Sequence, residues 1–275
     1  GNDHFALKMV EARSQFDQEE GADYCYKHVT YKSDKFPLTS PKGVGFLMPY
    51  MEVSGACAGC GETPYYRLLS QLFGKDMLVA NATGCSSIYC GSTPLTPFVK
   101  DKNGNGPAWA NSLFEDNAEY GFGMRVASDY KMMQIIRILN NAIASNEVAS
   151  ELKEVAKKYL DNIKNRDVIR TIVPTLMKLV SESKNEAVKE LKEYERDLID
   201  KSVWIVGGDG WSYDIGYGGL DHVLANEADV NVMVLDTELY SNTGGQASKS
   251  SQTGSINKFT ASGKKEAKKN LALLA

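Results

Sequence analysis

The stretch VWIVGGDG, residues 203–210, decides the fold because an apolar run passes directly into a glycine-rich turn. A helix-like segment follows at about 218–225, and a second apolar run, VNVMVLD, covers residues 230–236. Short apolar runs bounded by turn residues are typical of strands that are buried on both faces. Strand, turn, helix and strand in this order predict an α/β fold, with a mostly parallel sheet and helices on both faces.

Two more elements of this sheet domain are expected upstream. The segment YYRLLSQLF, residues 65–73, has the apolar spacing of a helix, and DMLVA, residues 76–80, has the composition of a short buried strand. Residues 101–122 contain turn signals and an acidic patch. Between about 126 and 200, apolar residues recur three and four positions apart among Lys and Glu, which predicts three or four amphipathic helices with solvated charged faces.

The organisation of the chain follows from these patterns. Residues 1–45 are polar, contain two prolines, and are expected to form an irregular lead-in or linker. Residues 46–275 are expected to form one domain that carries the helical stretch as an insertion. The chain starts without Met and stops at LALLA, residues 271–275, which has the composition of the middle of a helix. We therefore expect a fragment of a longer polypeptide.

Composition excludes several classes of function. The chain has 275 residues, of which 43% are hydrophobic and 24% charged, and these values are ordinary for a globular protein with a sizeable core. A net charge of -4 gives no electrostatic reason to expect nucleic acid as a partner. No apolar run reaches about 18 residues, so we expect no membrane span, and residues 1–11 lack the apolar region of a signal peptide.

The turn at Gly208-Asp209-Gly210 is a candidate site for a diphosphate held by a cation. Mg²⁺ prefers about six oxygen ligands, and Asp209 can give a carboxylate oxygen. Thr237, after the next strand, can give a hydroxyl or carbonyl oxygen, and the carbonyl near Leu239 can add another. Glycines let the backbone approach phosphates, and ligands of open α/β sheets bind at the carboxyl ends of strands. The alternative is a plain strand-to-helix turn.

The cysteines form a second candidate site. Cys57-Ala58-Gly59-Cys60 places two thiols on one tight loop, and Cys85 supplies a third. Two cysteines separated by two residues recur in iron–sulfur and zinc sites, so a cluster and a zinc ion both remain open, with a redox disulfide as a weaker alternative. A four-iron cluster needs four thiolates, and Cys25 and Cys90 are the other cysteines. An odd count without a secretory signal argues against a disulfide framework.

Five motifs of the chain resemble the thiamine diphosphate-binding domain of pyruvate:ferredoxin (flavodoxin) oxidoreductases. They are EVSGACAGCGETPY (52–65), ANATGCSS (80–87), GPAWANSLFEDNAEYGFG (106–123), VWIVGGDGWSYDIGYGGL (203–220) and DTELYSNTGGQASKSSQTG (236–254). The resemblance covers most of residues 46–268 and is weakest in 1–45 and 126–200. Thr237 stands where many thiamine diphosphate enzymes have Asn, and this departure matches the same family.

The resemblance implies roles for individual residues. It makes Asp209 and Thr237 side-chain ligands of Mg²⁺, with the carbonyl of Leu239 as a further ligand. It also places Asn242 at a position close to the substrate in enzymes of the family, so Asn242 is the candidate catalytic residue. The implied cofactor contacts are Glu62, Cys85, Gly208, Asp209, Gly210, Trp211, Thr237, Glu238, Leu239, Tyr240, Ser241 and Asn242. The implied ligands of a 4Fe–4S cluster are Cys57, Cys60 and Cys85, with a fourth ligand beyond residue 275.

The activity that the resemblance implies is oxidative decarboxylation of pyruvate to acetyl-CoA and CO₂. Electrons would pass through 4Fe–4S clusters to ferredoxin or flavodoxin. The family's activating glutamate and substrate arginine lie in an N-terminal domain and have no counterpart here, and the ferredoxin-like motif for two further clusters is absent. We therefore expect this chain alone to lack turnover, and to work with the other domains of a homodimer in the cytoplasm or in a hydrogenosome-like organelle.

Other interpretations remain open at this stage. An oxidoreductase for another 2-oxo acid fits the same motifs, and a zinc-binding structural module or an inactive scaffold would explain the cysteines alone. The basic run Lys258, Lys264, Lys265, Lys268 and Lys269 is expected to be a solvated helix face. Its alternative role is a docking surface for an acidic electron carrier or for coenzyme A.

Overall fold

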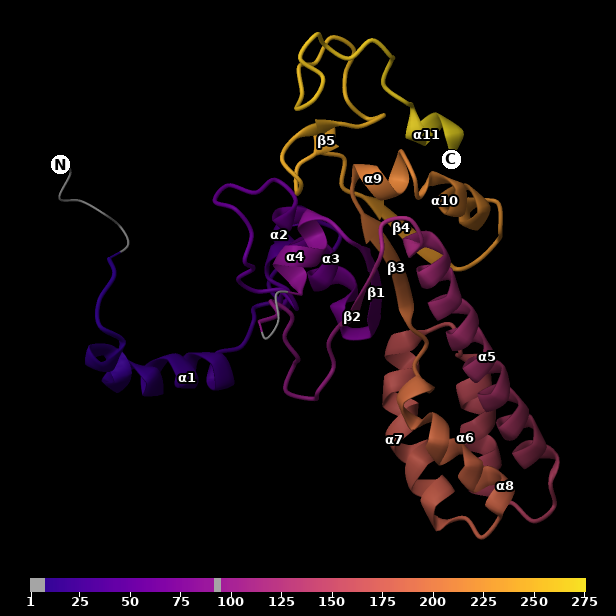
Figure 1. Ribbon diagram of the computed structural model, residues 1–275. Helices are drawn as coiled ribbons and strands as arrows, with labels where there is room; N and C mark the ends of the chain where they lie inside the picture. The colour runs from indigo at the N-terminus through magenta and orange to yellow at the C-terminus, as the bar shows by residue number, and fades with distance from the viewer. Residues whose placement is uncertain (1–7, 92–94) are drawn as a thin grey trace. The chain divides into compact units, whose positions relative to one another are not determined.

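The structure, a computed structural model, describes residues 8–91 and 95–275, and the chain divides into two compact units, residues 1–48 and 49–275 (Figure 1). The first unit contains the 3₁₀ helix η1 (Ala12–Gln18) and the helices α1 (Glu19–His28) and α2 (Pro41–Gly45). An irregular lead-in was therefore the wrong prediction for residues 12–28. Every residue of α1 is exposed. The helix has Glu19 and Glu20 in its first turn and Lys27 and His28 in its last turn. Acidic residues at the start and basic residues at the end of a helix interact favourably with the helix dipole and stabilise it.

The second unit is built on a four-stranded parallel sheet in the order β2-β1-β3-β4. Its strands are β1 (Met77–Ala82), β2 (Ala108–Ser112), β3 (Ser202–Gly207) and β4 (Val230–Val234). The predicted parallel α/β sheet is confirmed, and three of these strands lie where apolar runs predicted them. The fourth, β2, was not predicted because AWANS is a partly exposed edge strand with one large apolar residue, Trp109, among small and polar ones.

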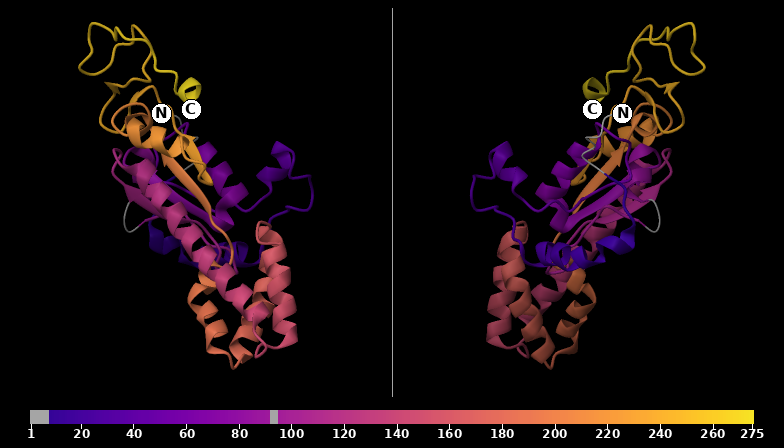
Figure 2. Two further views of the ribbon diagram at one scale, coloured as in Figure 1. Left: turned by 90° about the vertical axis from the view of Figure 1, so that its right-hand side faces the viewer. Right: turned by 90° about the vertical axis from the view of Figure 1, so that its left-hand side faces the viewer.

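Helices cover both faces of the sheet, as predicted (Figures 1 and 2). On one face, α5 (Asn117–Ala144) and α10 (Tyr217–Leu224) pack against side chains such as Ile205. On the other face, α3 (Thr63–Phe73) and α4 (Cys85–Cys90) pack against side chains such as Val79. The 3₁₀ helix η2 (Gly74–Asp76) leads from α3 into β1.

A helical bundle continues from the end of the sheet at which β3 begins (Figure 1). It contains the second half of α5, α6 (Ser150–Asp161), α7 (Arg166–Glu182), α8 (Glu186–Lys189) and the 3₁₀ helix η3 (Glu190–Asp197). Its buried side chains, among them Leu139, Tyr159 and Leu176, form an apolar core separate from those of the sheet. The predicted amphipathic helices are confirmed. Helix α5, however, begins at Asn117, before the predicted helical stretch, and its first turns pack against the sheet.

The remaining elements lie beyond the carboxyl ends of the strands. Helix α9 (Asp209–Ser212) follows β3, and the short antiparallel pair β5 (Leu239–Tyr240) and β6 (Gln246–Ala247) follows β4. Helix α11 (Leu271–Leu274) begins at Leu271 and is capped by Asn270, so these residues start a helix and do not form the middle of one, as the sequence had predicted. Among the described residues, no helix is both long and apolar enough to cross a membrane.

Candidate cofactor site at the carboxyl ends of the strands

A cavity of about 400 Å³ opens at the carboxyl ends of β1, β3 and β4. The chain leaves β1 toward β2 on one side and leaves β3 toward β4 on the other, so the connections diverge between β1 and β3. Open α/β sheets bind ligands at such a point of divergence. The predicted contact residues that line the cavity are Glu62, Cys85, Gly208, Asp209, Gly210, Trp211, Thr237, Leu239, Tyr240, Ser241 and Asn242.

Asp209 is the buried carboxylate of this cavity, with 3% of its surface exposed. Its Oδ1 accepts a hydrogen bond from the backbone N–H of Thr237 at 3.1 Å, and its Oδ2 accepts one from Ser248 Oγ at 2.8 Å. Burial raises the pKa of Asp209 to about 6, while these two hydrogen bonds act in the opposite direction. A cation beside this carboxylate would favour its charged form.

One of the three predicted Mg²⁺ ligands, Thr237, contacts both of the others in the structure. Thr237 links the set: its N–H binds Asp209, and its Oγ1 donates to the carbonyl oxygen of Leu239 at 3.0 Å. Between them, Glu238 adopts a positive φ of 62°, which turns the chain back on itself. One carboxylate, one hydroxyl and one carbonyl form a set of hard oxygen donors, and such a set fits Mg²⁺ with diphosphate and water completing the shell.

The glycines and aromatic residues around Asp209 shape the cavity wall. A Cβ atom at Gly210 would lie 3.4 Å from the ring of Tyr240, whose hydroxyl donates to Asp214 at 2.6 Å. Trp211 is 1% exposed, and a Cβ atom at Gly207 would lie 2.7 Å from its indole ring. Trp211 therefore lines the cavity and also packs between the sheet and α10.

Cys85 connects the cavity to the cysteine loop. Its Sγ lies 3.2 Å from Ser241 Oγ. Burial raises the pKa of the Cys85 thiol, and the charges of Glu62, Cys57 and Cys60 raise it further. The three predicted cluster ligands are therefore electrostatic neighbours. Within residues 8–91 and 95–275, however, no three His, Cys, Asp or Glu side chains are close enough to hold a metal ion. These thiols suit a cluster in type and are an incomplete set for it.

The other two cysteines lie in different surroundings. Cys90 is fully buried in the core beside Tyr66, and this burial raises its pKa well above the usual range. It packs as a small apolar residue. Cys25 is exposed on α1, in the first unit.

Ser248 and Tyr89 contact residues of the site and were not predicted from the sequence. Ser248 binds Asp209, and Tyr89 donates from its hydroxyl to Glu62 Oε2 at 3.0 Å. Ser248 lies inside the last motif quoted above, so that motif was a usable signal, whereas nothing in the local sequence marks Tyr89. One predicted contact differs: the side chain of Glu238 does not line the cavity and binds Gln252 and Lys268 instead.

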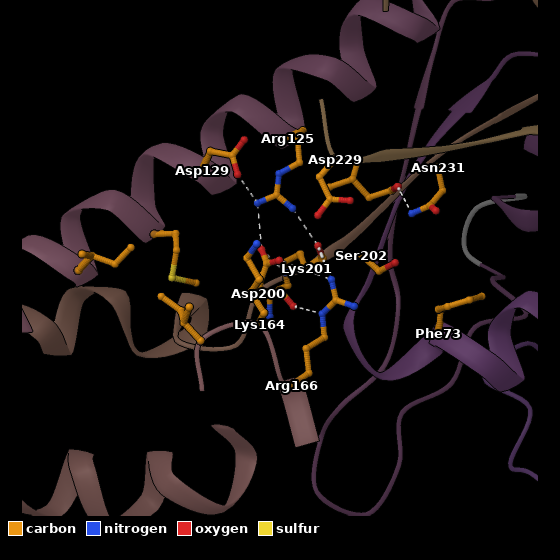
Figure 3. Close-up of a pocket in the computed structure, with 14 residues that line it drawn as sticks. Phe73, Arg125, Asp129, Lys164, Arg166, Asp200, Lys201, Ser202, Asp229 and Asn231 are labelled. Atoms are coloured by element: carbon orange, nitrogen blue, oxygen red, sulfur yellow. Dashed lines mark hydrogen bonds and ion pairs between the residues drawn. The ribbon is translucent and has the colours of Figure 1, made fainter. Parts of the chain in front are cut away.

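A larger cavity, of about 590 Å³, lies at the opposite ends of the strands (Figure 3). Arg125, whose side chain is 3% exposed, binds Asp129 at 2.6 Å and Asp200 at 2.9 Å. It also donates to the carbonyl of Lys201, and Arg166 donates to the carbonyl of Asp200. These bonds fasten the bundle to the start of β3, so the paired charges have a structural role.

Comparisons with known proteins find similarity to one family and to several individual proteins. Residues 191–275 match the family described as "Thiamine pyrophosphate enzyme, C-terminal TPP binding domain". This match includes the turn at Asp209 and the loop after β4. Residues 191–275 are therefore similar to a thiamine diphosphate-binding domain.

Similarity to individual proteins extends over nearly the whole chain. The pyruvate:ferredoxin oxidoreductase of Moorella thermoacetica is 48% identical over 277 residues, which are 98% of this chain and 24% of that protein. The pyruvate-flavodoxin oxidoreductase of Klebsiella pneumoniae is 48% identical over 272 residues, 98% of this chain and 23% of that protein. The pyruvate dehydrogenase [NADP(+)] of Cryptosporidium parvum is 44% identical over 280 residues, 89% of this chain and 14% of that protein.

The chain therefore has pyruvate:ferredoxin and pyruvate-flavodoxin oxidoreductases as homologues. It spans about a quarter of the length of these two relatives.

Proposed function

We propose that this chain supplies the thiamine diphosphate–Mg²⁺ site of an enzyme that oxidatively decarboxylates pyruvate to acetyl-CoA and CO₂. The observation that carries the proposal is the contact of Thr237 with both Asp209 and Leu239 at the wall of a cavity between diverging strands. The family match over residues 191–275 and the names of the relatives support it.

The residues of the cavity would divide the work of binding. Asp209, Thr237 and the carbonyl of Leu239 would hold Mg²⁺, and the glycines beside Asp209 would leave room for the diphosphate. When bound, thiamine diphosphate supplies the electron sink that decarboxylation of a 2-oxo acid requires. Asn242, on the same wall, would orient the substrate, and the partly buried carboxyl of Glu62 would face the cofactor.

Electron transfer is the second part of the proposal. Cys57, Cys60 and Cys85 would give three thiolates to a 4Fe–4S cluster, with the fourth from outside this chain. Because Cys85 also lines the cavity, one short helix would contact both cofactors. Ferredoxin or flavodoxin would accept the electrons and coenzyme A the acetyl group. The complete enzyme would be a homodimer in the cytoplasm or in a hydrogenosome-like organelle.

Replacing Asp209 tests the metal assignment. In the complete enzyme, Asp209→Ala should abolish Mg²⁺-dependent binding of thiamine diphosphate, measured by isothermal titration calorimetry, because the one buried carboxylate of the donor set is lost. Asp221→Ala, at an exposed position on α10, should bind as the wild type does. Circular dichroism checks that both variants fold. Tight Mg²⁺-dependent binding by a folded Asp209→Ala variant would contradict the assignment.

A further inference from the structure

The basic segment near the end of the chain does not form the solvated helix face that the sequence predicted. Residues 261–270 contain no helix, and three of the lysines bind other parts of the chain. Lys264 is 7% exposed and donates to the carbonyl of Ser251 at 2.7 Å, while Lys269 donates to the carbonyl of Tyr213 at 3.1 Å. The segment is therefore fastened onto the loops that follow β3 and β4.

Lys268 makes the contact nearest to the candidate metal ligands. Its Nζ lies 2.8 Å from Asp236 Oδ2 and 2.9 Å from Glu238 Oε1. These carboxylates belong to the residues on either side of Thr237. The Lys268 side chain is 29% exposed and does not line the cofactor cavity. The ammonium group of Lys268 thus bridges the carboxylates of the two residues that flank Thr237, from outside the cavity.

The backbone at Glu238 shows why such a bridge is needed. Its φ of 62° is uncommon for a residue with a Cβ atom, and such a conformation persists only where surrounding contacts impose it. Here Glu238 N–H donates to Asp236 Oδ1 at 3.0 Å, and Ser251 Oγ donates to the Glu238 carbonyl. Gln252 and Lys268 hold its carboxylate, each at 2.9 Å. The turn so fixed lets the Thr237 hydroxyl meet the Leu239 carbonyl.

Charge gives the bridge a second effect. Asp236 and Glu238 place two carboxylates beside a cavity that, on the proposed function, receives a diphosphate. Without a cation between them, they would repel that anion and each other. The positive charge of Lys268, which contacts both carboxylates, offsets this repulsion.

We propose that Lys268 is a positioning residue for the Mg²⁺–diphosphate site. It fixes Asp236 and Glu238, and through them the ligand pair Thr237 and Leu239, without touching the cofactor. This inference rests on the proposed function, since it assigns Lys268 to the same site.

The test compares variants of the complete enzyme by their affinity for Mg²⁺ and thiamine diphosphate. Lys268→Met should weaken Mg²⁺-dependent thiamine diphosphate binding roughly 10–100-fold, the range typical of residues that orient metal ligands. Lys268→Arg, which keeps the charge and can bridge both carboxylates, should recover most of the affinity. Lys265→Met is the matched control, because Lys265 is exposed and has no hydrogen bond or ion pair with any described residue.

A second measurement separates positioning from general destabilisation. Hydrogen–deuterium exchange of the cofactor-free enzyme should become faster at residues 236–242 in Lys268→Met, with no change in the bundle. Adding Glu238→Gln to Lys268→Met should recover part of the affinity, because one unpaired carboxylate is removed. If Lys268→Met does not fold, Lys268→Gln, which keeps an uncharged donor group, should show an intermediate loss.

The outcomes are distinguishable from failure of the proposed function. Wild-type affinity in Lys268→Met, beside lost binding in Asp209→Ala, would overturn the inference and leave the proposed function standing. Equal losses in Lys268→Met and Lys265→Met would also overturn it. No Mg²⁺-dependent thiamine diphosphate binding by the wild-type enzyme would instead refute the proposed function.

Discussion

The hydroxyl of Tyr89 joins the two segments that supply the candidate cluster ligands. Tyr89 is 4% exposed on α4, four residues after Cys85, and it donates to Glu62, which follows Cys60 by two residues. The carboxyl of Glu62 is partly buried, and this burial raises its pKa. Loss of its hydrogen-bond donor would leave a partly buried acceptor unsatisfied.

Tyr89→Phe tests this link. We expect the free energy of unfolding to fall by about 1–3 kcal/mol, the usual cost of a buried acceptor left without a partner, and thiamine diphosphate affinity to fall with it. Tyr65→Phe is the control, since Tyr65 is 62% exposed and its hydroxyl has no partner among the described residues. Urea unfolding and calorimetry would measure both effects. Equal values for the two variants would show that the Tyr89 hydroxyl holds nothing in place.

Individual site residues differ in how far the sequence could predict them. Asp209 and Thr237 come within three residues of the ends of apolar runs, so their meeting at one edge of the sheet could be expected from the parallel topology. Ser248, Tyr89 and Lys268 reach the site by the packing of segments far apart in the chain. Local composition carries no information about such packing, and for Lys268 it favoured the wrong environment. Of the three residues, only Ser248 lies in a motif that could have marked it.

Helix α5 lies close to the sheet because of one glycine. A Cβ atom at Gly121 would lie 2.4 Å from Ile205 Cγ1 and 3.1 Å from Ala80 Cβ, both on strands of the core. Two residues later, Gly123 is exposed and has no atom within 4 Å of such a Cβ. The two glycines therefore have opposite roles in one helix.

Alanine at these two positions should have opposite effects on stability. Gly121→Ala should lower the free energy of unfolding by about 1–3 kcal/mol, because the added methyl overpacks the core. Gly123→Ala should raise it by about 0.5–1 kcal/mol, because alanine is the better helix former. Thermal or urea unfolding followed by circular dichroism would measure both. A stabilising Gly121→Ala would contradict the close contact between α5 and the sheet.

The two elements that were not predicted from the sequence, β2 and α1, lack a periodic pattern of apolar residues. Strands β1, β3 and β4 are apolar runs, and the bundle helices repeat apolar residues at helical spacing, so all of them could be predicted. Edge strand β2 has one large apolar residue, Trp109, among small and polar ones, and α1 buries none of its side chains. Hydrogen bonding to a neighbouring strand stabilises the first, and charge order along the helix axis supports the second.

The whole chain spans about a quarter of the length of the two oxidoreductases compared above. Its sheet domain brings the candidate Mg²⁺ ligands together, and its bundle has a core of its own. The three candidate cluster thiols are incomplete for a four-iron cluster, and the relatives are about four times as long. Turnover and electron transfer are therefore expected only from the complete enzyme.

The most direct test of the account is anaerobic iron and sulfide analysis of the complete enzyme, with an absorption spectrum in the presence of thiamine diphosphate and Mg²⁺. We predict iron, sulfide and a broad visible absorption band that bleaches when pyruvate and coenzyme A are added, because electrons from pyruvate would reduce the clusters. Stoichiometric zinc, no iron and no bleaching would contradict the account and leave the cysteine loop with a structural role.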